Sequence, residues 1–143
     1  MRRLAVTSAA VVAMLTVASL ASGTPRATLI VGKSGYGSIL YDGRGFALYA
    51  FTHDPARRST CFGRCASAWP PYVVSGAPAA GSGADSALIG TTRRPDGTRQ
   101  VTYAGRPLYY YVGDRKPGQV LCQNVTEFGG VWLVVRASGS LVR

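Results

Sequence analysis

One motif occurs twice in this chain, and this repetition restricts the fold more than any other feature of the sequence. The motif reads Tyr, any residue, an aromatic residue, two further residues and Asp, and its second copy starts 60 positions after the first. Two related units are too few for a solenoid, in which several repeats must stack to bury a continuous core. We therefore expect two similar halves that bury one common core. The first copy consists of Tyr49, Phe51 and Asp54, and the second of Tyr109, Tyr111 and Asp114.

Short apolar runs separated by turn signals surround both copies of the motif. The runs are rich in β-branched and aromatic residues, and Asp-Gly pairs occur between successive runs in each half. Asp-Gly in this position is among the strongest hairpin signals. We therefore expect an antiparallel meander of three strands in each half, and the valines that follow Trp69 and Trp132 indicate a fourth strand in each. The expected strands are 27–31, 37–41 and 46–52 in the first half, and 87–92, 99–103 and 107–112 in the second.

These elements predict an all-β fold in which two related antiparallel β-meander repeats, of three to four strands each, form one small domain. We place repeat one at about 27–74 and repeat two at about 87–135, within a single domain that spans 27–143. Residues 75–86 are rich in Gly, Ala, Ser and Pro, which is typical of a linker. A short helical or looped insertion is expected at about 61–68.

The first 21 residues have the composition of a signal peptide. Arg2 and Arg3 precede an uncharged apolar run, and Ser19 and Ala21 supply small residues at the positions that a signal peptidase reads. We expect cleavage near 21–23, export from the cytoplasm and no stable membrane anchor afterwards. The alternative is a signal anchor that is never cleaved, because the apolar run approaches the shortest length that spans a bilayer.

The chain is strongly basic, with 16 Lys and Arg against 6 Asp and Glu and a formal net charge of +10. Loss of the signal peptide would leave 14 basic residues against 6 acidic ones, a net charge of +8. The basic residues are scattered as pairs such as Arg57-Arg58 and Arg93-Arg94, a dispersion that argues against nucleic acid as the partner. For an exported protein we expect an anionic cell-wall polymer or an envelope protein as the partner. The oligomeric state stays open.

Side chains for acid–base catalysis are scarce in this sequence. Six carboxylates and a single His, His53, serve the whole chain, and Glu127 is the only Glu. The sequence contains no nucleophile elbow and no zinc-protease motif. We therefore expect a protein that is not an enzyme and that uses no cofactor.

The duplicated motif itself supports two interpretations. Residues two apart in a strand share one face, so each copy places two aromatic rings side by side with a carboxylate at the strand end. One interpretation is core packing, with the Asp accepting backbone hydrogen bonds in the turn that follows. The other is an aromatic platform that stacks on a sugar or binds a cation. The candidate binding residues are Tyr49, Phe51, Asp54, Tyr109, Tyr111 and Asp114.

The three cysteines raise a separate chemical question. Cys61 and Cys65 are one helical turn apart if their segment is helical, a separation that suits a disulfide, and an oxidising compartment favours that bridge. Cys122 is then the odd cysteine, which is buried and inert, paired between chains, or reactive. The alternative is an extracytoplasmic metal-binding or redox protein in which His53, Cys61, Cys65 and Cys122 converge on one zinc or copper(I) ion.

Several sequence blocks, in the same order, resemble a family of bacterial secreted repeats also described as predicted lipoproteins. The blocks are the doubled motif, S-T-C-F-G-R-C-A-S-A-W-P-P, P-D-G-T-R-Q-V-T-Y-A-G-R-P-L-Y and G-G-V-W-L-V-V, and they extend from about Gly37 to Val135. The resemblance implies an exported or lipid-anchored envelope protein whose molecular function is not established. This chain lacks the cysteine that a lipoprotein carries after its signal segment, which favours release or retention in the wall. We expect an exported, non-enzymatic envelope or secreted protein that binds a ligand or a wall polymer.

Overall fold

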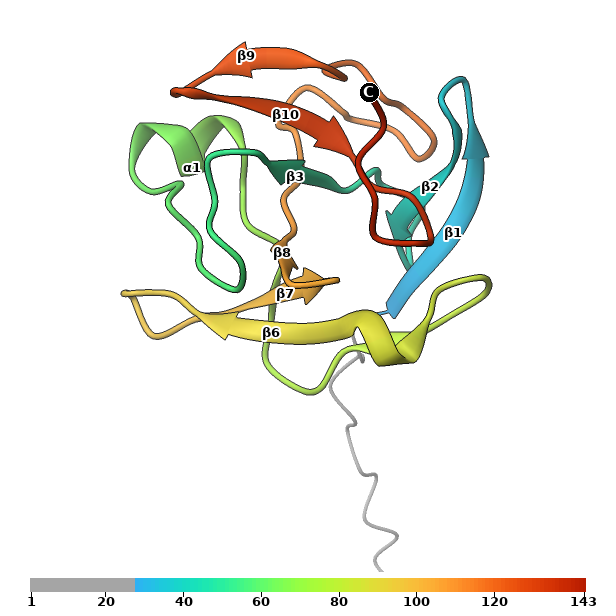
Figure 1. The fold of residues 1–143 in the computed structure, drawn as a ribbon, viewed down its shortest axis with the longest axis horizontal. Coiled ribbons are helices and arrows are strands. Elements are labelled where there is room, and N and C mark those ends of the chain that lie inside the picture. Colours follow the sequence, from blue (N-terminus) through green and yellow to red (C-terminus); the bar gives the residue numbers. More distant parts are fainter. Residues whose placement is uncertain (1–27) are drawn as a thin grey trace, which may run out of the picture.

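The computed structural model describes residues 28–143, so the expected signal peptide at 1–21 and its cleavage region lie outside the described residues. Strands dominate the described part, accompanied by one short α-helix and one 3-10 turn (Figure 1). Within 28–143, no helix is long and apolar enough to cross a membrane. These elements confirm the all-β fold class and the short insertion expected near 61–68. In chain order they are β1 (Thr28–Ser34), β2 (Gly37–Asp42), β3 (Tyr49–Phe51), α1 (Arg64–Ala68), β4 (Val73–Val74), β5 (Ala79–Ala80), η1 (Ser86–Leu88), β6 (Ile89–Arg93), β7 (Arg99–Tyr103), β8 (Arg106–Pro107), β9 (Val125–Glu127) and β10 (Gly130–Val134).

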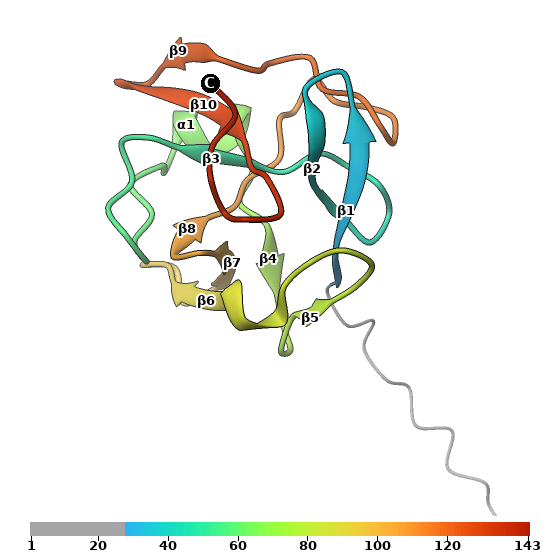
Figure 2. The same ribbon diagram turned by 45° about the vertical axis from the view of Figure 1, so that its right-hand side comes forward.

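The strands form three small sheets, and two of these sheets combine strands from both halves of the chain (Figures 1 and 2). β1 pairs with β2 in antiparallel and with β5 in parallel orientation. β10 pairs with β3 and β9, and β7 pairs with β4, β6 and β8, all antiparallel. Since β3 and β4 belong to the first half whereas β10 and β7 belong to the second, each half completes a sheet of the other.

The second meander follows its prediction through β6 and β7, but its third strand, expected at 107–112, is only the short β8 (Arg106–Pro107). The first meander departs from its prediction. The turn at Asp96-Gly97 joins β6 to β7, and β7 then turns back onto β8. In the first half the chain also turns back after β2, where the Phe46 carbonyl accepts the Asp42 N–H at 2.9 Å. The chain then leaves β2, and β3 pairs with β10 of the other half. Local alternation of residues could not reveal this pairing, because the partner strand lies far along the sequence.

Residues 75–86 contribute to a sheet, although their composition is typical of a linker. Ala79–Ala80 form β5 beside β1, and the Gly81 N–H donates to the Leu29 carbonyl at 2.7 Å. A Cβ atom at Gly81 would lie 2.6 Å from Cγ2 of Ile30, so only glycine allows the two backbones to approach this closely. The glycine-rich composition therefore reflects close packing against β1.

The first residues of the two motif copies meet at the centre of the fold. The Tyr49 N–H donates to the Tyr109 carbonyl at 2.8 Å, and the Tyr109 N–H donates to the Tyr49 carbonyl at 2.9 Å. This reciprocal bridge joins equivalent residues of the two halves. One buried cluster around this bridge contains both tyrosines, both tryptophans and the pair Cys61 and Cys65.

Candidate functional site

Each motif tyrosine donates its phenol hydrogen to the aspartate of the other motif copy. Tyr49 Oη lies 2.6 Å from Asp114 Oδ2, and Tyr109 Oη lies 2.6 Å from Asp54 Oδ2. A hydrogen bond to a charged carboxylate contributes more to stability than a neutral one, typically about 1.5–3 kcal/mol. The two bonds are equivalent under the repeat, and both connect one half of the protein to the other.

The second aromatic residue of each copy also contacts the other half. Phe51 stacks on Trp132 with ring centroids 4.2 Å apart, and Trp132 stacks on Trp69 at 4.0 Å with an interplanar angle of 3°. Tyr111 continues the series against Trp69 at 4.8 Å. The four rings thus form a column whose centre is the pair of tryptophans. The repeat relates the two ends of the column, and its two tryptophans, in the same way as it relates the two tyrosine–aspartate bonds.

The burial of the motif decides between its two interpretations. Both motif tyrosines have no exposed surface, Phe51 is 4% exposed and Asp114 is 8% exposed. Asp54 and Tyr111 are half-buried. A ring that stacks on a sugar must present its face to solvent. The structure therefore places these six residues in the joint between the two halves, and they do not form the surface platform that the sequence allowed.

Burial also controls the ionisation of this joint. It raises the pKa of Asp54 and of Asp114, and the hydrogen bonds from the tyrosines lower these pKa values without cancelling the effect of burial. Burial, together with the hydrogen bond to the aspartate, raises the pKa of Tyr49 and of Tyr109 well above its usual range. The phenols therefore remain protonated donors.

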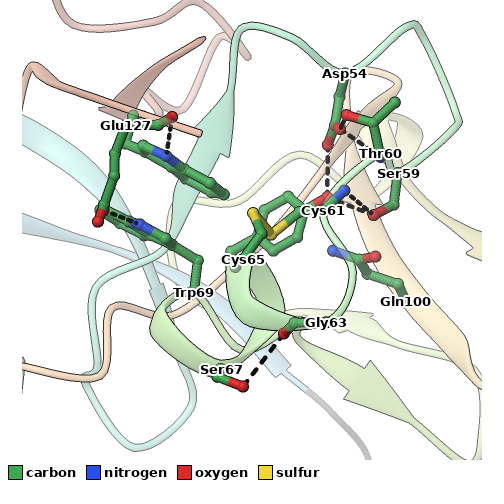
Figure 3. The surroundings of a disulfide bond; sticks show 12 residues. Asp54, Ser59, Thr60, Cys61, Gly63, Cys65, Ser67, Trp69, Gln100 and Glu127 are labelled. Atoms are coloured by element: carbon green, nitrogen blue, oxygen red, sulfur yellow. Dashed lines mark hydrogen bonds between the residues drawn. A yellow bond between two sulfur atoms is a disulfide. The ribbon is translucent and has the colours of Figure 1, made fainter. Parts of the chain in front are cut away.

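Cys61 and Cys65 form a disulfide with their Cα atoms 5.2 Å apart, which confirms the predicted bridge (Figure 3). The Cys65 carbonyl at the start of α1 accepts the Trp69 N–H at 2.8 Å. The Trp69 ring then enters the core, where its Nε1 donates to Glu127 Oε2 at 2.9 Å. The disulfide thus fixes the short segment that positions one of the two central tryptophans.

Cys122 is the structural counterpart of Cys61. The residue before each cysteine donates its backbone N–H to a motif aspartate, at 2.7 Å for Thr60 and at 2.9 Å for Leu121. Unlike Cys61, Cys122 forms no disulfide within the described residues. Burial raises the pKa of this thiol, which disfavours the reactive thiolate.

The alternative metal or redox site is not assembled in the described residues. The sulfur atoms of Cys61 and Cys65 are bonded to each other and therefore are not thiolate ligands. His53 is exposed, and its ring lies 5.8 Å from that of Phe51. Between 28 and 143, no three His, Cys, Asp or Glu residues are grouped so that they could hold a metal ion. The alternative function built on this set has no support in the structure.

Charged side chains are distributed very unevenly between the interior and the surface. Among the described residues, twelve of the thirteen basic side chains are exposed, but only three of the six acidic ones are. The other three carboxylates, Asp42, Asp54 and Asp114, accept hydrogen bonds inside the fold. Within the same range the only ion pair joins Arg44 to Asp42. The ratio of basic to acidic side chains is consequently higher at the surface than in the sequence as a whole.

Two of the scattered basic pairs meet in space. Arg58, Arg93 and Arg94 line one cavity of about 680 Å³, although the pairs are far apart in the sequence. The Thr92 Oγ1 donates to the Arg57 carbonyl at 2.5 Å and so connects the two segments. Arg94 is 5% exposed, whereas Arg58 and Arg93 reach the surface. Sequence reasoning missed this cluster because no local pattern links the two pairs.

The comparisons with known proteins agree with the duplicated architecture. No curated protein and no solved structure is a significant match to the chain. A family model described as a secreted repeat of unknown function matches twice, at residues 31–72 and 90–136. The two matches together cover more than half of the chain, and each contains one copy of the motif. The chain therefore belongs to this family of secreted repeats.

Proposed function

We propose that this protein is an exported, non-enzymatic binding domain whose ligand is an anionic polymer of the cell envelope. The proposal rests on the charge of the surface, where twelve basic side chains are exposed against three acidic ones. Such an imbalance attracts polyanions and raises their association rate. Membership in a family of secreted repeats supports polyanions of the envelope, rather than nucleic acids, as the ligand.

The use of the carboxylates supports binding rather than catalysis. Asp54 and Asp114 hold the two halves together through the motif tyrosines. Asp42 accepts hydrogen bonds from the side chains of Arg44 and Tyr110. Half of the acidic groups are therefore committed to the fold, whereas general acid–base catalysis needs a titratable group within reach of a substrate.

Retention on purified wall material tests the proposal. The protein is applied to wall polymer that carries its anionic groups and to the same material after these groups have been removed. We expect retention on the anionic material alone, and elution at a few hundred millimolar salt, because salt screens exposed charges over a Debye length of about 10 Å at 0.1 M. Equal retention on both materials, or retention that salt does not weaken, would overturn the proposal. Release of polymer fragments during the incubation would contradict the non-enzymatic part.

A further inference from the structure

Arg94 has an unusual environment for a buried cation. Its Nη1 donates to Ser59 Oγ at 2.8 Å and to Gln100 Oε1 at 2.7 Å, and its Nη2 donates to the Cys61 carbonyl at 2.8 Å. All three acceptors are neutral. Figure 3 shows Ser59 and Gln100 close to Cys61, one of the two cysteines of the disulfide. The protein thus fixes the position of the guanidinium group without neutralising its charge.

The hydrogen-bonding capacity of Arg94 is incompletely used. Its Nε is buried and has no partner, and the single bond of Nη2 leaves one of its hydrogens over. Asp54 is the nearby carboxylate whose pKa responds to the charge of Arg94, but the hydroxyl groups of Ser59 and Tyr109 connect the two residues and no direct ion pair forms. Nε and Nη2 form one edge of the planar guanidinium fork, the edge that binds an oxyanion through two parallel bonds. A buried donor without an acceptor is costly, and a bound anion would remove this cost.

The cavity next to Arg94 is lined by further cationic groups and by an apolar ring, a combination that suits an anion. Arg58 and Arg93 add two exposed guanidinium groups to that of Arg94. The Phe62 ring lies over Arg94, with the Arg94 Cζ 4.7 Å from the ring centroid, and forms an apolar wall. Phe62 is 42% exposed, so this apolar wall of the cavity lies at the surface of the molecule. The volume of about 680 Å³ lies in the range of small-molecule sites, about 300–1,000 Å³.

We propose that this cavity binds a phosphate group, with Arg58 and Arg93 making the outer contacts and the free edge of Arg94 the inner one. Three guanidinium groups exceed what one carboxylate can satisfy, whereas a phosphate offers more acceptor oxygens and a higher charge. That this phosphate group belongs to an envelope polymer rests on the function proposed above. The cavity itself would also take the phosphate of a small ion.

Titration with pyrophosphate tests the cavity directly. The Arg94 Nε–H signal in a ¹H–¹⁵N NMR spectrum reports on the buried side-chain nitrogen that has no hydrogen-bond partner among residues 28–143. We expect pyrophosphate to shift this signal in a saturable manner, and citrate, a carboxylate ion of comparable charge, to shift it more weakly. A signal that does not move, or shifts of equal size at arginines over the whole surface, would overturn the assignment. Tighter binding of citrate than of pyrophosphate would overturn the choice of phosphate.

Two double variants of equal charge provide the matched comparison. R58Q/R93Q removes the outer contacts of the cavity, and R115Q/K116Q removes two exposed charges from a different loop. We expect pyrophosphate affinity to fall about tenfold in the first variant, about 1.4 kcal/mol, and less than about twofold in the second. R94K, which keeps the charge but loses the fork, is expected to weaken binding as well. Equal losses of pyrophosphate affinity in both double variants would overturn the assignment of this cavity as the phosphate site.

The proposed function and the cavity can fail separately. If wild-type protein is retained on anionic wall polymer but R58Q/R93Q is retained no less than R115Q/K116Q, the cavity is not the polymer site and the proposed function stands. If wild-type protein is not retained on the polymer but binds pyrophosphate through Arg94, the cavity stands and the polymer is the wrong source of the phosphate.

Discussion

Tyr49 and Asp114 are 65 positions apart in the chain, yet their side chains share a hydrogen bond of 2.6 Å in the core. The same bond recurs between Tyr109 and Asp54, so neither copy of the motif is complete without the other. This reciprocal exchange gives a physical reason for the duplication. Within its own half each aspartate has a partner for Oδ1 alone, so the carboxylate Oδ2 and the buried phenol of each half find their mutual partners only when the two halves join. Unpaired buried polar groups are strongly destabilising.

Loss of the motif phenols should weaken the fold and leave ligand binding unchanged. Tyr49→Phe and Tyr109→Phe each remove one donor to a buried carboxylate and should lower the free energy of unfolding by about 1.5–3 kcal/mol. Both variants should still be retained on anionic wall polymer like the wild type, because these rings have no exposed surface. Denaturant unfolding and the retention assay check the two parts. Loss of retention by a variant that remains folded would restore the platform interpretation of the motif.

Alkaline pH should destabilise the protein through its buried tyrosines. Burial raises the pKa of Tyr49, Tyr109 and Tyr110 above the ordinary value of 10.0. The stability that these phenols contribute is therefore fully present below pH 10 and is lost as the pH rises further, because the unfolded chain releases the protons first. Each such group can contribute a slope of about 1.4 kcal/mol per pH unit.

The measurement is the free energy of unfolding from pH 8 to 11, together with the ultraviolet signal of tyrosine ionisation. We expect these three of the eight tyrosines to ionise only as the protein unfolds. The double variant Y49F/Y109F should show a shallower decline above pH 10 than the wild type. Ionisation of all eight tyrosines in the folded state would contradict this prediction.

Reduction of the disulfide should produce a modest loss of stability. The loop that Cys61 and Cys65 close is very short, so chain entropy predicts a contribution of about 2 kcal/mol. C61S/C65S should unfold at correspondingly lower denaturant concentration, and C122S serves as the control because Cys122 is free. One free thiol in the unfolded, non-reduced protein is the expected result of titration. Three would show that the bridge does not form.

The two central tryptophans should be equally important for stability. Trp69 and Trp132 are both fully buried and stack on each other at 4.0 Å. Truncation of either to Ala should cost about 3–5 kcal/mol, as for other buried aromatic residues. Tyr36, which is 43% exposed, is the matched control, and Tyr36→Ala should change stability little. A large difference between the two tryptophan variants in thermal or denaturant unfolding would contradict the symmetric column.

The sequence predicted local features well and pairings between the halves poorly. Asp-Gly turns and alternating apolar residues located the hairpin of β6 and β7, because both signals act over a few residues. The pairing of β3 with β10 and of β4 with β7 depends on contacts between distant segments, which no local pattern encodes. β5 was missed because two alanines among glycines carry no strand signal of their own.

The same limit applies to the candidate sites. The motif was found by repetition alone, and its spacing predicted a carboxylate at the end of its own strand but not the hydrogen bonds that Tyr49 and Asp54 each make to the other copy. In the sequence, Arg93 and Arg94 are only one of several scattered basic pairs. Its approach to Arg58, and the unused donor of Arg94, depend on how the turn after β6 packs against the loop before α1.

A double-mutant cycle on the motif tests the interlocked fold most directly. Tyr49→Phe is combined with Asp114→Asn in one cycle and with Asp54→Asn in a second, and the free energy of unfolding is measured for each variant. We predict a coupling energy of about 1 kcal/mol or more between Tyr49 and Asp114, and additive effects, within about 0.5 kcal/mol, for Tyr49 and Asp54. The opposite result, with Tyr49 coupled to the aspartate of its own motif copy, would contradict the reciprocal exchange between the two halves.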